Sequence, residues 1–179
     1  MIVIDALRQE HEMIDTVIKR AVQIAQDIRN GHVNDLDTMD EIVNFLIKFT
    51  NQYHFGKEEE YLFPTLFEKG VPDENGPVGV MLKQHALARE YLASMTEALE
   101  KLKAGRGGYS AKILHRNTES YAKLLENHMQ KENTVLFPMI KEVLSSEEQD
   151  QLEKDIQAFI QRKPQAEIYE QYANLAARL

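Results

Sequence analysis

Apolar residues recur three and four positions apart along most of the chain, which is the spacing of one face of an α-helix. Four long segments show this spacing, at about 4–30, 38–64, 77–103 and 110–144, and glycine-containing stretches separate them. The two-residue alternation typical of strands does not persist. The pattern predicts an all-α fold, an antiparallel up-down four-helix bundle made of two helical hairpins.

Residues at the ends of these segments indicate where the helices begin and end. Gly31 follows the first segment, where a glycine commonly closes a helix. Thr38 with Glu41 three residues later predicts a capping box at the start of the second. Leu-Phe-Pro occurs near the ends of the second and fourth segments, where we expect the proline to end or bend the helix.

The pattern changes after residue 144. Ser145 with Glu148 predicts another capping box, and Pro164 separates the helix that follows from a last amphipathic one. We therefore expect a bundle domain over 1–144 and a helical extension over 145–179. The apolar stripe of the last helix must pack on the bundle or on a second copy in a homo-oligomer.

An internal repeat carries the candidate chemistry. The eleven residues that begin at His54 and at His128 both follow His-x-x-Lys-Glu-x-x-x-Leu-Phe-Pro, and six positions are identical at an offset of 74 residues. The same offset relates His11 to His85. Each predicted hairpin thus has one histidine on its first helix and a His-x-x-x-Glu on its second, which indicates a duplication.

Helix geometry predicts that these side chains meet. In each hairpin the two histidines are equally distant from the turn, so they lie at one depth in the bundle. All occupy apolar stripes, where an unpaired polar group costs roughly 2–7 kcal/mol. Metal ions would remove that cost. The predicted ligands are His11, His54, Glu58, His85, His128 and Glu132.

These donors suffice for two ions, each bound by two histidines and bridged by both glutamates. Imidazole with carboxylate favours non-haem iron or manganese, and helical bundles commonly house such pairs. If zinc filled the site instead, two histidines and two carboxylate oxygens would complete its tetrahedral coordination and give an inert binding module.

The two repeated stretches, together with Gly-Pro-Val-Gly-Val-Met-Leu-Lys-Gln-His ending at His85, resemble the hemerythrin-like family of HHE cation-binding domains over roughly 4–144. The resemblance implies two non-haem iron ions, oxo- or hydroxo-bridged, held by the six residues named above. Arg89 stands where the oxygen carriers of the family have a further histidine. The six-ligand pattern is similar to that of di-iron proteins that repair damaged iron–sulfur clusters, although their Cys-containing amino-terminal segment has no counterpart here.

Three other residues are candidates for an outer layer around the metal. Asp15 and Arg89 occupy equivalent places in the two repeats, one turn from His11 and His85, and we hypothesise that they pair across the bundle or guard an entrance. Tyr121 lies about two turns from His128 and is a candidate hydrogen-bond donor to a metal-bound ligand. Glu59 and Glu60 are expected to face water.

Composition narrows the function classes. The chain of 179 residues has no Cys, which excludes disulfides, thiolate metal sites and thiol catalysis. A net charge of −8 without a basic stripe argues against nucleic acid or an anionic membrane as partner. No apolar run is long enough to span a bilayer, and Asp5 and Arg8 interrupt any secretory signal, so we expect a cytoplasmic protein.

The leading hypothesis is a di-iron protein that binds a small diatomic ligand, dioxygen or nitric oxide, for sensing, storage or protection against oxidative or nitrosative stress. The alternative is a di-iron redox enzyme, or an iron donor for damaged iron–sulfur clusters. Turnover would require an electron-donor protein, because the chain offers no second cofactor motif.

Overall fold

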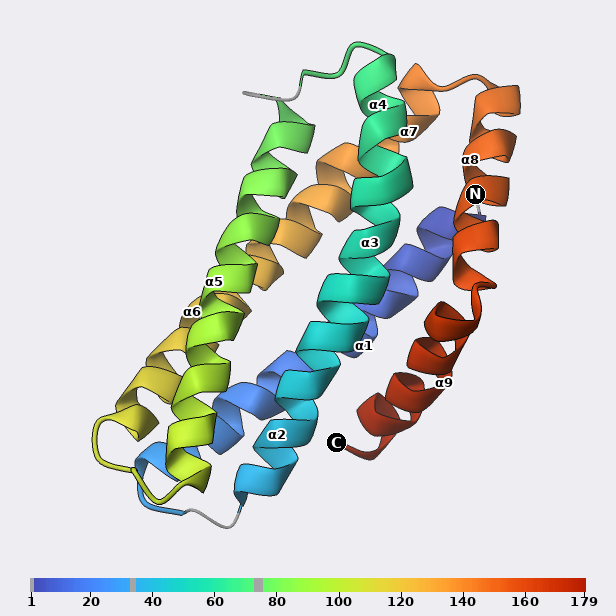
Figure 1. Ribbon diagram of the computed structural model, residues 1–179. Helices are drawn as coiled ribbons and strands as arrows, with labels where there is room; N and C mark the ends of the chain where they lie inside the picture. Colours follow the sequence, from blue (N-terminus) through green and yellow to red (C-terminus); the bar gives the residue numbers. More distant parts are fainter. Residues whose placement is uncertain (1, 33–34, 73–75) are drawn as a thin grey trace.

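Helices account for nearly all of the chain in the computed structural model, which describes residues 2–32, 35–72 and 76–179 (Figure 1). The described residues contain no strand. Several helices run on through π-helical segments, labelled η. The elements are α1 (Ile2–Arg29), α2 (Leu36–Phe45), η2 (Leu46–His54), α3 (Phe55–Lys57), η3 (Glu58–Leu62), α4 (Phe63–Glu68), α5 (Pro77–Lys103), α6 (Ser110–Lys131), η4 (Glu132–Leu136), α7 (Phe137–Val143), α8 (Ser146–Ile160) and α9 (Lys163–Arg178).

The first ten of these elements form four long helices that pack side by side. The helix from α2 to α4 lies beside α1 and α5, and the helix from α6 to α7 lies beside α5 and α1 (Figure 1). The predicted four-helix bundle is confirmed.

Apolar side chains fill the bundle in two clusters, one toward each end. One cluster takes residues from 14–28, 39–55, 88–102 and 114–129, and the other takes residues from 3–7, 62–71, 78–81 and 136–144. The predicted ligands of every helix therefore lie at or near the boundary between the two clusters.

Helix ends agree with the sequence at two of three predicted caps. Gly31 has φ 96°, and the N–H groups of Gly31 and His32 donate to Ile28 and Asp27, which closes α1 in a Schellman motif. The capping box at Ser145 is also present. The one predicted at Thr38 is wrong, because α2 already begins at Leu36.

The Leu-Phe-Pro stretches do not end their helices, which continue to Glu68 and Val143. A proline has no N–H and clashes with the carbonyl four residues earlier in an α-helix. Just before each proline the backbone changes to π-helical pairing, in which Phe63 and Phe137 donate to carbonyls five residues back, on Glu58 and Glu132. We attribute the uninterrupted helix to this wider turn.

The two carboxy-terminal helices lie along one side of the bundle (Figure 1). Helix α8 contacts α1 and η3, and α9 contacts α1 and η2. The bundle therefore covers their apolar stripes within the same chain, burying Leu152, Ile156, Phe159, Tyr172 and Leu175. Leu144 is extended and separates α7 from α8, and the division into two domains at this point stays a prediction.

Candidate metal centre

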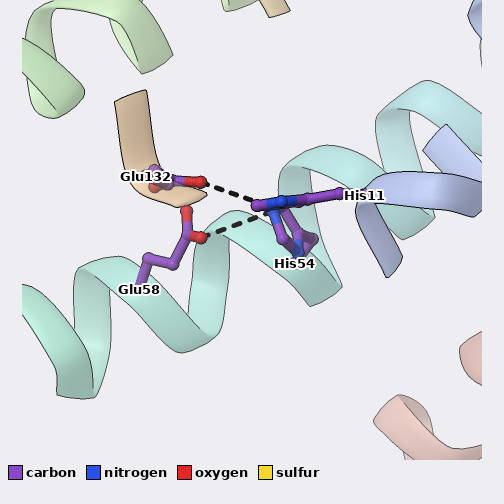
Figure 2. A group of neighbouring side chains, drawn as sticks. All are labelled: His11, His54, Glu58 and Glu132. Carbon is purple, nitrogen blue, oxygen red and sulfur yellow. Dashed lines mark ion pairs between the residues drawn. The ribbon is translucent and has the colours of Figure 1, made fainter. Parts of the chain in front are cut away.

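The six predicted ligands lie together at the centre of the bundle. Four helices supply them: α1 supplies His11, η2 and η3 supply His54 and Glu58, α5 supplies His85, and α6 and η4 supply His128 and Glu132. They form two groups of four that share both glutamates, and the ligand atoms within each group lie within 4.8 Å of one another. Figure 2 shows the group that contains His11 and His54. The most exposed of the six, His11, is only 4% exposed.

Glu58 directs one oxygen toward each group. Its Oε1 is 3.3 Å from Nε2 of His54, and its Oε2 is 3.3 Å from Nε2 of His85. The carboxylate thus stands between a histidine of the first hairpin and one of the second, as a bridging ligand would.

Glu132 makes the equivalent pair of contacts. Its Oε2 is 3.1 Å from Nε2 of His11, and its Oε1 is 3.4 Å from Nε2 of His128. All four imidazoles therefore present Nε2 to the centre. The duplication seen in the sequence is reproduced as an approximate two-fold arrangement of side chains.

Both glutamates occupy the first position of a π-helical segment. Such segments inside α-helices occur frequently at functional sites. These segments were not predicted from the sequence, although the Leu-Phe-Pro that begins four residues after each glutamate is a signal for them.

Many polar atoms at the centre are buried without a hydrogen-bond partner. They include both oxygens of Glu58 and of Glu132, and Nε2 of His11 and His54. Buried polar groups are normally paired, and unpaired ones are costly. Divalent cations would bind these lone pairs, and nitrogen with oxygen donors suits iron, manganese or zinc. The residues present therefore fit a pair of metal ions.

Burial also shifts the protonation equilibria of the centre. It raises the pKa of Glu58, with a further contribution from the neighbouring Glu132 charge, and it raises the pKa of Glu132 to about 8. Burial lowers the pKa of His11 and His54, and it lowers that of His128 well below its usual value. Without metal, these shifts favour the neutral forms of the two glutamates and of these three histidines, so metal binding would release protons from the carboxyl groups.

A buried ion pair that the sequence analysis missed supports His54. Glu10 Oε2 is 2.8 Å from Nδ1 of His54, and its other oxygen accepts from Lys57. Glu10 and Lys57 are 2% and 1% exposed. Burial opposes ionisation of Glu10, but the Lys57 charge and the His54 hydrogen bond outweigh it and lower its pKa. Lys57 Nζ also lies 4.1 Å from the centroid of the Tyr53 ring.

Glu59 supports His85 in a similar way, and the expectation that it faces water is wrong. Its Oε1 is 2.7 Å from Nδ1 of His85, and Arg89 donates to both of its oxygens at 2.8 and 2.9 Å. Burial opposes protonation of His85, but the neighbouring carboxylates of Glu58 and Glu59 raise its pKa. Arg89 therefore belongs to the surroundings of the centre through Glu59.

The predicted pairing of Asp15 with Arg89 is wrong. Asp15 pairs with Lys19 on the surface of α1 at 2.6 Å, one turn along the same helix. Tyr121 is buried beside Thr50, burial raises its pKa, and its hydroxyl has no hydrogen-bond partner. A role for Tyr121 toward a metal-bound ligand stays a prediction.

The fold and the site together define a metal-binding helical bundle, and comparison with known families agrees. The model of the Hemerythrin HHE cation binding domain matches residues 2–140 and, in a second alignment, residues 84–175. The chain belongs to this family, which confirms the resemblance inferred from the repeated motif. None of the described helices is both long and apolar enough to cross a membrane.

Curated relatives come from two mycobacteria. The uncharacterized proteins Rv1995 of Mycobacterium tuberculosis (strain H37Rv) and Mb2018 of Mycobacterium bovis are each 28% identical over 140 residues, which covers 74% of this chain and 52% of theirs. The chain thus spans about half the length of the curated relatives it matches.

Proposed function

We propose that this chain is a non-haem di-iron protein that binds a small diatomic molecule, dioxygen or nitric oxide, in sensing, storage or stress protection. One observation carries the proposal: two groups of histidines share the carboxylates of Glu58 and Glu132. Two ferrous ions in these groups would supply electrons and open coordination positions for such a ligand.

Burial favours a ligand of very few atoms. Aromatic rings cover the histidines, with Phe55 stacked on His85 at 3.6 Å between centroids and Phe137 stacked on His11 at 5.7 Å. A bulky or charged substrate would have to displace these rings and lose its hydration, whereas an uncharged diatomic molecule would not.

The residues of this chain have separable tasks. Two histidines would hold each ion, through Nε2, together with the carboxylates of Glu58 and Glu132. Glu10 and Glu59 fix two of the rings through Nδ1. The apolar clusters on either side exclude water and slow the loss of bound ions.

The test is anaerobic reconstitution with Fe²⁺, followed by elemental analysis and optical spectra before and after exposure to air or nitric oxide. We expect two iron ions per chain and new near-ultraviolet bands after oxidation. A matched variant, His128→Ala, should retain the helical circular dichroism signal and lose these bands. Full iron occupancy without any spectral response to either gas would refute the proposal, as would zinc at two ions per chain in protein from unsupplemented cells.

Multiple turnover with a supplied reductant would instead favour the di-iron redox enzyme, and transfer of iron to an apo iron–sulfur protein would favour the iron donor.

A further inference from the structure

The outward nitrogen, Nδ1, of three ligand histidines lies near a side-chain oxygen, and these oxygens are of two kinds. His54 and His85 face the carboxylates of Glu10 and Glu59, as described above. The other two histidines face amides.

The amide partners are less closely bound. Nδ1 of His128 lies 3.3 Å from Oε1 of Gln84. His11 lies beside Asn133, whose side chain raises the pKa of the ring, although their geometry falls short of a hydrogen bond.

The internal repeat accounts for these partners, and it shows that carboxylates in the first hairpin correspond to amides in the second. The offset of 74 residues relates Glu10 to Gln84 and Glu59 to Asn133. At these equivalent positions around the centre the first hairpin supplies carboxylates, and the second supplies the corresponding amide side chains.

The carboxylates are divided evenly between the two groups of ligands. In the group of His11 and His54, the carboxylate of Glu10 faces His54. In the group of His85 and His128, the carboxylate of Glu59 faces His85. Each group thus combines one carboxylate-bonded ring with one amide-facing ring.

We propose that Glu10 and Glu59 are positioning residues that give each of the two metal positions one carboxylate-bonded histidine, so that both positions bind a divalent ion with similar affinity. The inference rests on the proposed two-metal centre. A carboxylate behind an imidazole fixes the ring and makes it a more basic ligand, and loss of such a partner typically weakens metal binding 10- to 100-fold.

Glu59 is the better of the two glutamates to substitute, because removing its charge does not leave an uncompensated charge in the core. Glu59 and its partner Arg89 have side chains 27% and 41% exposed, so water can solvate the guanidinium charge that Glu59→Gln would no longer balance. Glu10 is paired with the buried Lys57 instead.

The first experiment titrates Zn²⁺ into metal-free protein in competition with a chromophoric chelator. Wild type should bind two ions with affinities that are not resolved. Glu59→Gln keeps an acceptor oxygen and removes the charge, so we expect one ion to bind about 10- to 100-fold more weakly while the other is little changed. Glu60→Gln is the matched control, because Glu60 is the exposed neighbour that pairs with Arg162 at the surface.

The second experiment moves the carboxylate between the two metal positions. Adding Gln84→Glu to Glu59→Gln returns a carboxylate to the same position, through His128, and should restore two similar affinities. Adding Asn133→Asp instead places the carboxylate at the other metal position, through His11. The two affinities should then stay different, or the difference should increase. Because a gain in affinity does not arise from misfolding, the rescue separates positioning from general damage.

The outcomes distinguish the inference from the proposed function. If wild type binds fewer than two Zn²⁺ ions, the two-metal centre is refuted and the inference with it. If wild type binds two ions but Glu59→Gln behaves like Glu60→Gln, only the inference is refuted. Equal rescue by Gln84→Glu and Asn133→Asp, or rescue by neither, would also refute it, because the effect would then not depend on which metal position holds the carboxylate.

Discussion

Substitution of Lys57 by methionine tests the buried ion pair behind His54. Methionine keeps the unbranched stem and removes the ammonium group, which Glu10 binds and the Tyr53 ring covers. The carboxylate of Glu10, 2% exposed, would then keep only its contact with Nδ1 of His54, at 2.8 Å.

The expected loss in the free energy of unfolding follows from that remaining contact. Removing one partner of a buried ion pair typically costs about 3–5 kcal/mol, because the other charge stays buried without compensation. A hydrogen bond to a charged group contributes about 1.5–3 kcal/mol, so the His54 contact should keep the cost of Lys57→Met near the lower end, at about 3 kcal/mol. Glu10→Gln with Lys57→Met leaves no buried charge and should lie within about 1 kcal/mol of wild type.

The assay is urea unfolding of the metal-free protein at pH 7, with the four members of the double-mutant cycle compared at equal m-value. Lys69→Met is the matched control, because Lys69 pairs with Glu148 at the surface, where both are more than a third exposed, and should cost under about 1 kcal/mol. A cost below about 1 kcal/mol for Lys57→Met, or a double variant as unstable as the sum of its two singles, would show that the pair is not coupled as the structure indicates.

Three further predictions concern stability. In the metal-free protein Glu132, with its pKa raised to about 8, keeps a proton that the unfolded chain loses near pH 4.5. Glu132 should therefore make the unfolding free energy fall by about 1.4 kcal/mol per pH unit from about pH 6.5 to 8, and the raised pKa of His85 acts in the same direction. Glu132→Gln should reduce that fall in urea titrations across pH. Below about pH 6.5, His11, His54 and His128, whose pKa values are lowered, should reverse the trend. Phe159→Ala removes a buried ring that packs on Tyr53 and should cost about 3–5 kcal/mol in thermal or urea unfolding; a cost below about 1 kcal/mol would mean that α8 does not pack as described. Ser145→Ala removes a helix cap and should cost about 0.5–2 kcal/mol by the same measurement, whereas no loss would contradict the capping box.

The convergence of the six candidate ligands could be predicted because it depends on spacing alone. In an antiparallel hairpin, residues equally distant from the turn share a depth, and helical periodicity sets the face on which they lie. His11 with His54 and His85 with His128 satisfy both conditions. The repeat distinguishes them from His115, because the residue 74 positions before His115 is Glu41 and not a histidine. The structure gathers all six, although their role as ligands stays a prediction until metal is bound.

The surroundings of the site could not be predicted in the same way. Glu59 directly follows Glu58, and its direction depends on the π-helical segment that begins at Glu58. Glu10 and Lys57 lie 47 residues apart, and a buried pair of opposite charges leaves no more trace in the sequence than two surface residues do. Asp15 was paired with the wrong partner because equivalence under the repeat gives matching depth but not contact.

Short-range periodicity and a duplicated motif are enough to predict the helices, their order in the bundle and the level at which six polar side chains enter the core. The side chain that lies behind each imidazole, the π-helical turn before each proline, and the packing of α8 and α9 on their own bundle are known from the three-dimensional structure alone. Those features depend on distances between side chains brought together from different helices, and a fraction of a turn in helix phase is enough to change them.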